Sequence, residues 1–332
     1  MHKISLTGSD LSFACAERDT VMRAALRAGV GMSYSCNVGS CGNCRFELVA
    51  GAVDHLRADA PAWTEKDRKR GRWLGCQARP LSDCVVKFRA DPDAVPVHRP
   101  VQRSGVLVSR DALNHDMAEF AFRIDGEPGF LPGQYALLSV PGVAGARVYS
   151  MCNLPDEDIW RFQIKRVPGG AATTLLFDNL RPGDAIALDG PYGLAHLRPD
   201  IPRDIVLLAG GSGLSPMVSI ARAAVAAPGL QGRTVHFYFG GRGPADLAPA
   251  ACVTPLVSDR FRLVTAISDP ALAGNWAGPI GFIHDIALAD LGPRLAECEI
   301  YFAGPPAMAA AIRTSLHAQG VPAGQIHFDE FY

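Results

Sequence analysis

Three cysteines within nine residues constrain this chain more than any other feature of its sequence. Cys36, Cys41 and Cys44 are spaced C-x4-C-x2-C, and Cys76 follows after 31 further residues. This is the spacing of plant-type [2Fe–2S] clusters. Two glycines inside the loop allow its backbone to approach a metal centre closely and to adopt positive φ angles. The pattern therefore predicts an iron–sulfur cluster on these four cysteines and transfer of single electrons.

Zinc and disulfides are the alternative interpretations of these cysteines. Structural zinc sites usually combine two close pairs of ligands, whereas this chain has one trio and one distant cysteine. Disulfides belong to oxidising compartments, and an odd total of nine cysteines suits a reducing cytosol better. The remaining cysteines lack ligand spacing and are expected to be ordinary buried thiols: Cys15, Cys84, Cys152, Cys252 and Cys298.

Charge and hydropathy limit the kinds of partner. The net charge is −1, so we expect no general attraction to nucleic acid or to an anionic membrane. No apolar run approaches the length of about 18 residues that a membrane span needs. The first residues lack the apolar core of a secretory signal, which favours a cytoplasmic protein. A length of 332 residues predicts two or three domains.

The first predicted domain, residues 1–92, contains the four cysteines. Residues 4–13 indicate a hairpin, and residues 20–28 read as a helix with Gly29 just past its end. Further short strands around residues 46–53 and 85–88 complete a small mixed sheet, the β-grasp arrangement of such ferredoxins. Three prolines within residues 91–100 then predict a stiff linker.

The hydrophobic period differs between the two halves of the remaining chain. Residues 101–198 show alternating strands separated by Pro-Gly turns, which predicts an antiparallel barrel or sandwich. From residue 203 to 332, continuous apolar strands alternate with helical patterns, which predicts a doubly wound parallel sheet. The expected fold class is thus multidomain, combining α+β and α/β architecture.

A motif in the second domain carries a family resemblance. Arg147-Val-Tyr149-Ser150 is preceded by Pro-Gly-Gln-Tyr at residues 132–135 and followed by Lys165-Arg-Val-Pro-Gly-Gly-Ala-Ala-Thr at residues 165–173. With these pieces in order, the chain resembles the ferredoxin–NADP⁺ reductase-like flavoprotein superfamily. The resemblance implies FAD bound in an antiparallel barrel. Arg147 would contact its pyrophosphate, Tyr149 would stack on the isoalloxazine ring, and Ser150 would hydrogen-bond the reactive ring nitrogen.

The same resemblance assigns further cofactor residues. Lys165 and the backbone from Gly170 to Thr173 would lie around the FAD pyrophosphate, at a helix N-terminus where anions bind favourably. The nicotinamide nucleotide would lie against two glycine motifs, one after a buried strand and one at the end of a later strand. These motifs contain Gly211, Ser212, Gly213 and Pro216, and then Gly304, Pro305 and Met308. Where the family usually has cysteine before the second motif, this chain has Ala303.

The choice between NADH and NADPH rests on two residues after residues 235–239. Asp246 can bind a ribose 2′-hydroxyl, whereas Arg242 can accommodate a 2′-phosphate. Because related oxygenase reductases mostly use NADH, we expect NADH, with NADPH possible.

The whole chain looks most like the reductase component of bacterial multicomponent oxygenases, such as the toluene and phenol monooxygenase reductases of aromatic hydrocarbon catabolism. The resemblance implies electron flow from NADH to FAD, to the cluster, and on to an oxygenase or hydroxylase component or a Rieske-type ferredoxin. It also implies a C-terminal aromatic over the flavin, either Phe331 or Tyr332. The alternative to such a shield is a tail that packs on the nicotinamide domain. A reductase for another acceptor and a non-enzymatic redox sensor are the rival functions.

A basic run, residues 65–72, precedes the fourth cysteine. It is either a solvated helix face or a docking patch for an acidic electron acceptor.

Overall fold

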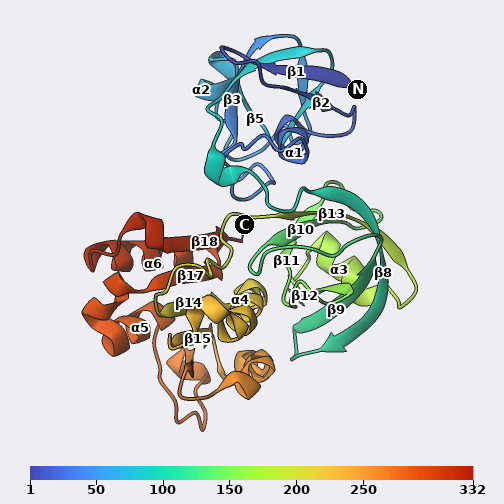
Figure 1. The fold of residues 1–332 in the computed structure, drawn as a ribbon. Coiled ribbons are helices and arrows are strands. Elements are labelled where there is room, and N and C mark those ends of the chain that lie inside the picture. The colour runs from blue at the N-terminus through green and yellow to red at the C-terminus, as the bar shows by residue number, and fades with distance from the viewer. Residues whose placement is uncertain (332) are drawn as a thin grey trace. The chain divides into compact units, whose positions relative to one another are not determined.

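A computed structural model describes residues 1–331. Its N-terminal part contains seven strands: β1 (His2–Leu6), β2 (Ser12–Cys15), β3 (Arg45–Ala50), β4 (Val53–His55), β5 (Arg72–Leu74), β6 (Ala78–Pro80) and β7 (Cys84–Lys87). Five of them form one sheet in the order β2-β1-β7-β3-β5. Figure 1 labels β1, β2, β3 and β5 of this sheet. β1 runs parallel to β7, whereas the other neighbours are antiparallel. This is the small mixed sheet that the sequence predicts.

Two helices accompany this sheet. Helix α1 (Val21–Arg27) buries an apolar face, and Gly29 follows its end with a φ of 79°, a conformation that glycine adopts without steric cost. Helix α2 (Glu65–Lys69) begins with a capping box in which Thr64 and Asp67 exchange hydrogen bonds. A 3₁₀ turn, Pro92–Ala94, begins the proline-rich segment.

The next part is an antiparallel sheet of six strands: β8 (Val101–Ala112), β9 (Met117–Ile124), β10 (Tyr135–Ser139), β11 (Arg147–Ser150), β12 (Ile159–Lys165) and β13 (Ala185–Tyr192). Their order is β11-β10-β13-β8-β9-β12. An antiparallel bridge between Met151 and Phe162 connects the two edges, so the sheet nearly closes into a barrel. Helix α3 (Ala171–Asp178) follows β12, and alternating residues such as Phe120, Phe122 and Trp160 fill the core.

The last part is a five-stranded parallel sheet in the order β16-β15-β14-β17-β18. Its elements are β14 (Ile205–Gly210), α4 (Leu214–Ala226), β15 (Val235–Gly241), β16 (Phe261–Ile267), α5 (Ile283–Leu291), β17 (Glu299–Gly304), α6 (Pro306–Ala318) and β18 (Ile326–Glu330). Both faces of the sheet are covered by apolar clusters, which explains why its strands are continuous apolar runs. The predicted fold class is therefore confirmed.

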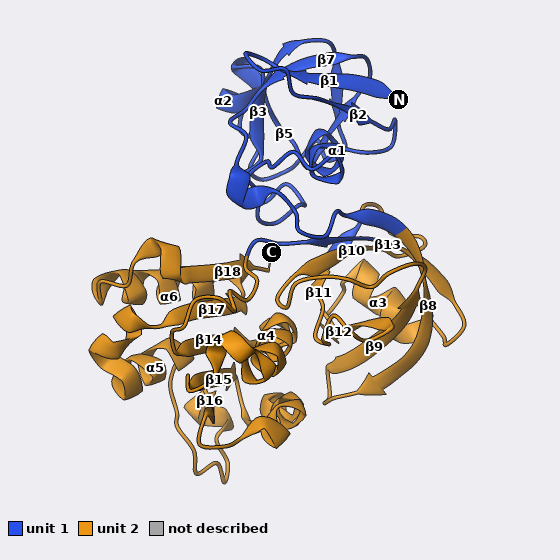
Figure 2. Cartoon of the chain, in the orientation of Figure 1, with its two compact units in different colours: residues 1–102, 146–148, 189–194 blue, residues 103–145, 149–188, 195–332 orange. Residues whose placement is uncertain are grey.

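The chain divides into two compact units (Figure 2). The first contains residues 1–102 with two short segments, 146–148 and 189–194. The second contains the rest of the barrel together with the parallel sheet. The boundaries of the three predicted domains, 1–92, 101–198 and 203–332, stay predictions.

Candidate functional site

The four predicted cluster cysteines lie in one place in the first unit. The loop that carries Cys36, Cys41 and Cys44 connects α1 to β3, and Cys76 follows β5. The four thiols form two pairs. The thiol of Cys36 interacts with that of Cys41, which is the main cause that lowers the pKa of Cys41. The thiols of Cys44 and Cys76 interact in the same way, which lowers the pKa of Cys76. Two pairs of soft thiolate donors are the set that two iron atoms sharing a cluster require.

Backbone N–H groups also point at these sulfurs. The amides of Ser40 and Cys41 donate to the sulfur of Cys36 at 3.3 Å each, and the amide of Cys76 donates to Cys44 at 3.5 Å. Hydrogen bonds of this kind stabilise negative charge on ligand sulfur and tune cluster potentials. Cys41 is the most exposed of the four cysteines, whereas the other three are buried.

Three side chains that sequence reasoning missed hold this loop. Arg23 of α1 donates to the side-chain and backbone oxygens of Asn37, which has a positive φ of 55°. Arg45 donates to the carbonyl of Gly42 at 2.9 Å, and Gln77 donates to the sulfur of Cys76 at 3.7 Å. The contacts of Arg45 and Gln77 are local in sequence and that of Arg23 spans 14 residues, but none of these side chains belongs to the cysteine spacing from which the site was predicted.

Strand β11 carries the three residues that the resemblance assigns to FAD. Arg147 is exposed, Tyr149 is half-buried and packs against the barrel core, and Ser150 is buried. The hydroxyl of Ser150 is a buried polar atom with no hydrogen-bond partner within residues 1–331. A buried hydroxyl normally has a partner, so this one fits a ligand atom such as the flavin ring nitrogen.

The predicted pyrophosphate loop follows β12. Gly170 is the N-cap residue of α3, whose first amides have no partner within the helix. The Thr173 hydroxyl accepts a hydrogen bond from the amide of Val167 at 3.1 Å and thereby closes the loop around Gly170. An anion such as the FAD pyrophosphate fits this helix N-terminus.

The two glycine motifs meet where the strand order reverses, because β15 and β17 lie on opposite sides of β14. Ligands bind at such a switch point in open α/β sheets. A Cβ on Gly213 would lie 1.9 Å from the carbonyl oxygen of Ala303, so only glycine permits this approach of the loops. Met308 covers both motifs, since a Cβ on Gly210 or Gly304 would lie within 2.8 Å of its sulfur.

The other predicted residues of the motifs lie beside them. Gly211 has a φ of 55° and Ser212 is half-buried, both within the turn between β14 and α4. Pro216 is buried in the first turn of α4, and Pro305 is the exposed N-cap residue of α6.

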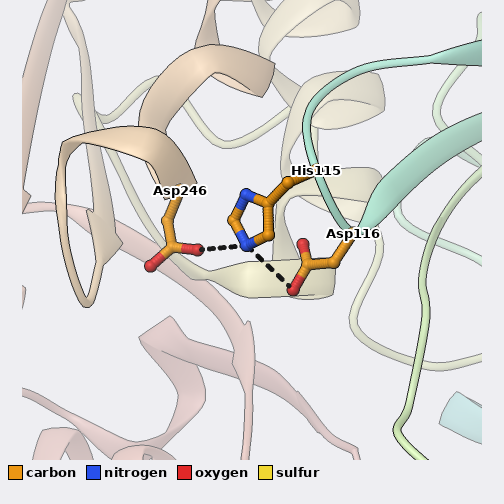
Figure 3. A group of neighbouring side chains, drawn as sticks. All are labelled: His115, Asp116 and Asp246. Carbon is orange, nitrogen blue, oxygen red and sulfur yellow. Dashed lines mark ion pairs between the residues drawn. The ribbon is translucent and has the colours of Figure 1, made fainter.

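The two residues expected to select the nicotinamide cofactor differ in their surroundings. Arg242 is exposed after β15. One carboxylate oxygen of Asp246 accepts hydrogen bonds from the amides of Arg242 and Gly243, at 2.8 and 3.2 Å. Its other oxygen lies 3.7 Å from His115 and 3.8 Å from Lys165 (Figure 3 shows the histidine).

This group is an ion-pair network between the barrel and the end of β15. Asp116 lies 3.0 Å from Lys165 and 3.6 Å from His115. His115, Asp116 and Asp246 also have the donors of a metal site (Figure 3). The Lys165 ammonium contacts both carboxylates and offsets one of their two negative charges, so a side-chain cation already lies beside these donors.

The chain end lies beside the second glycine motif. The amide of Phe331 donates to the carbonyl of Gly304 at 3.0 Å, and its ring packs against the apolar cluster that contains Ala303. Tyr332, named as the alternative flavin shield, lies outside the described residues.

The comparisons with known proteins match three domains along the chain. Residues 4–81 match the 2Fe-2S iron-sulfur cluster binding domain, residues 104–197 the oxidoreductase FAD-binding domain, and residues 207–314 the oxidoreductase NAD-binding domain. The chain is 38% identical over 323 residues to a ferredoxin–NAD(P)⁺ reductase of Metapseudomonas resinovorans, covering 96% of each chain. This chain belongs to the ferredoxin–NAD(P)⁺ reductases that combine these three domains.

Other relatives give the same result. The ferredoxin–NAD⁺ reductase component of an alkene monooxygenase system from Xanthobacter autotrophicus is 38% identical over 327 residues, with 96% of this chain and 98% of that one covered. A solved ferredoxin reductase in carbazole 1,9a-dioxygenase superposes with a TM-score of 0.91 at 35% identity, covering 100% of this chain and 98% of that one. The [2Fe–2S] cluster, FAD and NAD(P)H are therefore the cofactors of this oxidoreductase, as the sequence predicts. The zinc and disulfide interpretations of the four cysteines are wrong.

Proposed function

We propose that this chain is the reductase component of an oxygenase system, which takes electrons from NADH and delivers them singly to an oxygenase component or a Rieske-type ferredoxin. The observation that carries the proposal is full-length similarity to reductase components whose chains combine the same three domains. Relatives named for phenol and xylene/toluene monooxygenases support a role in aromatic hydrocarbon catabolism. No helix within residues 1–331 is long and apolar enough to cross a membrane.

Different residues of the chain bind FAD and the nicotinamide nucleotide. When bound, FAD accepts a hydride and releases two electrons one at a time, and the cluster carries one electron at a time. Ser150 donates its otherwise unpartnered hydroxyl to the flavin, and Arg147 with the N-terminus of α3 holds the pyrophosphate. The loops at Gly213 and Gly304 bind the nicotinamide nucleotide beside the barrel.

For the nucleotide we propose NADH over NADPH. Asp246 places a carboxylate at the end of β15, where a 2′-phosphate would meet negative charge. The exposed guanidinium of Arg242 keeps NADPH as the weaker substrate. Phe331, next to Gly304, is the aromatic that we propose covers the flavin in the absence of nucleotide.

Steady-state and rapid kinetics test the function. Anaerobic mixing with NADH should bleach the flavin within milliseconds to seconds, and turnover with cytochrome c should follow; NADPH should support both at a higher KM. A reductase for some other acceptor should also reduce cytochrome c but should fail with every oxygenase component and Rieske-type ferredoxin. Flavin reduction without any transfer to one-electron acceptors would instead favour the redox sensor and overturn the proposal.

A further inference from the structure

A surface beside the cluster loop combines exposed cations with half-buried tryptophans. We define the basic face as the side chains of Trp63, Lys66, Arg68, Lys69, Arg70, Arg72 and Trp73. All five cations are exposed. Within residues 1–331, no carboxylate lies within ion-pair distance of Lys66, Lys69, Arg70 or Arg72. Glu65 is the one exposed acid in this stretch, because Asp67 is buried and paired with Arg45 at 3.2 Å. The face thus has surplus positive charge although the chain as a whole is nearly neutral.

Arg45 fixes the basic face to the cluster loop. Its guanidinium pairs with Asp67 of α2 and also donates to the carbonyls of Gly42, at 2.9 Å, and Ala62, at 2.6 Å. The amide of Ala62 in turn donates to the carbonyl of Gly39 at 3.1 Å. Gly39 and Gly42 both lie between the cluster cysteines, so α2 and the loop are held as one rigid piece.

The tryptophans give this face an aromatic centre. Trp63 stacks on His55 with ring centroids 4.1 Å apart, and its centroid is 5.0 Å from that of Trp73. The guanidinium of Arg68 lies 4.3 Å from the centroid of the Trp63 ring, and this cation–π contact holds the guanidinium at the surface. Protein–protein interfaces are enriched in aromatic residues and arginine at their centre and have polar residues at their rim. The basic face has this composition.

We propose that the basic face is the docking site for an acidic protein that carries a one-electron redox centre. The inference rests on the proposed function and adds the place and charge of the acceptor. A docked partner must approach the cluster, and Cys41, the most exposed cluster cysteine, lies in the loop that Arg45 joins to α2. Opposite charge on the partner would steer it to this face and align the two redox centres. This location favours a redox protein over nucleic acid or a membrane surface, which need no cluster nearby.

A matched pair of charge reversals tests the docking site in the full-length holoenzyme. The patch variant K66E/K69E changes two unpaired lysines of α2. The control K3E/R18E makes the same change in net charge; Lys3 lies on β1 and pairs with β2, at the opposite end of the sheet from β5. The probe is an acidic Rieske-type ferredoxin, whose potential lies above that of a plant-type cluster. Basic cytochrome c is the acceptor of opposite charge, and ferricyanide reports on the flavin.

The two proposals fail in different ways. The patch variant should reduce the acidic ferredoxin about tenfold more slowly than wild type at low ionic strength, with the difference shrinking as salt rises, while the control keeps the wild-type rate. Both variants should keep ferricyanide activity and reduce cytochrome c at least as fast as wild type. Equal losses in the patch and control variants, or a patch variant that reduces the acidic ferredoxin at the wild-type rate, would overturn the docking site, whereas a wild type that reduces cytochrome c but not this ferredoxin would count against the proposed function. A wild type that reduces no protein acceptor would overturn the proposed function instead.

Discussion

Ser150 is the single residue whose surroundings most directly call for a ligand. Its hydroxyl is buried without a partner, while its own carbonyl accepts a hydrogen bond from the hydroxyl of Ser215 at 2.7 Å. The bond from Ser215 fixes the backbone of Ser150, so the protein itself positions the strand that carries this hydroxyl. A hydrogen-bond donor that is positioned before the reaction stabilises developing charge with little cost in reorganisation energy.

Replacing Ser150 with alanine should slow flavin reduction by NADH about tenfold or more, the effect of losing a hydrogen bond worth at least ~1.4 kcal/mol in the transition state. FAD should stay bound, because the pyrophosphate is held elsewhere. Stopped-flow absorbance measures the rate, and flavin content is the control. An unchanged reduction rate would remove Ser150 from the mechanism.

The buried carboxyl group of Asp329 leads us to predict an unusual pH dependence of the free energy of unfolding. Burial raises the pKa of its carboxyl from 3.8 to about 7 in the folded chain. Folding must therefore keep this group protonated at a pH where the unfolded chain has released the proton. The contribution of this carboxyl group to the free energy of unfolding is greatest below about pH 4. It decreases as the pH rises to about 7 and is constant above that pH.

The variant Asp329→Asn should remove this loss. Its melting temperature should exceed that of wild type at pH 8, where the shift corresponds to roughly 4 kcal/mol, and the advantage should vanish towards pH 4. Thermal unfolding followed by circular dichroism from pH 4.5 to 8 gives the comparison. A melting-temperature difference that does not change with pH would show that Asp329 ionises freely in the folded state.

The residues that sequence could identify are those with a local signature. The four cluster cysteines could be predicted from their spacing, and Ser150 could be predicted from its position in a motif. Arg45, Asn37 and Gln77 support the same cluster loop, yet their contacts depend on how the loop folds back on itself and on α1, which the spacing of the cysteines does not show. Asp246 accepts hydrogen bonds within its own loop and also forms an ion pair with Lys165. The ion pair could not be predicted, because Lys165 lies far from Asp246 in the sequence.

At the scale of elements, α4 attaches the parallel sheet to the barrel. Ser215, Ser219 and Arg222 lie on one face of the helix, at intervals of four and three residues. They donate to backbone carbonyls at or just after β11, those of Ser150, Asn153 and Cys152. The helix therefore brings the nicotinamide loop at its N-terminus to the strand that carries Ser150.

Substituting Ser219 with alanine should weaken this attachment. The carbonyl of Asn153 would lose the 2.7 Å hydrogen bond in a fully buried position, which costs about 1–3 kcal/mol. Thermal unfolding should show a lower melting temperature than for Thr314→Ala, a matched loss of a hydroxyl on the exposed side of α6. Equal melting temperatures for the two variants would contradict an attaching role for Ser219.

The last strand leads to a prediction about Phe331. β18 ends at Glu330, so Phe331 follows it with only its amide bonded to Gly304. If its ring shields the flavin, Phe331→Ala should change the apparent affinity for NADH and speed oxygen consumption without an acceptor. If the ring only packs against the sheet, the melting temperature alone should fall, as for other lost aromatic contacts. Oxygen-electrode assays beside thermal unfolding separate the two roles.

Element types were predictable because their periodicities are strong. The apolar run at residues 205–209 and the glycines after it fix β14 and the start of α4, and alternation fixes β9 and β12. Ends were less predictable: the aromatic-rich residues 328–332 read in the sequence as the final strand, whereas β18 begins two residues earlier, at Ile326, and ends at Glu330. Pairing with β17 sets that end, and a partner strand leaves no trace in the local sequence.

At the scale of the whole molecule, the cluster cysteines lie in the first unit, whereas Ser150, the N-terminus of α3 and both nicotinamide loops lie in the second. Arg147 is the exception among the predicted flavin residues, because segment 146–148 belongs to the first unit. The barrel and the parallel sheet share one unit because α4 bonds to the barrel backbone. Three domains could be predicted from changes in periodicity, but not which of them pack together, since that depends on side chains such as Ser219.

This separation predicts the behaviour of Cys41→Ala. Losing one of four thiolates should destroy the cluster, while the second unit keeps its own apolar cores and its flavin. The variant should therefore retain NADH–ferricyanide activity, in which the flavin suffices, and lose cytochrome c reduction, in which the cluster is required. Cys298→Ala, at a buried thiol far from the cluster in sequence and in the other unit, should keep both activities. Iron analysis decides the ligand assignment, because an unchanged iron content in Cys41→Ala would mean that other residues hold the metal.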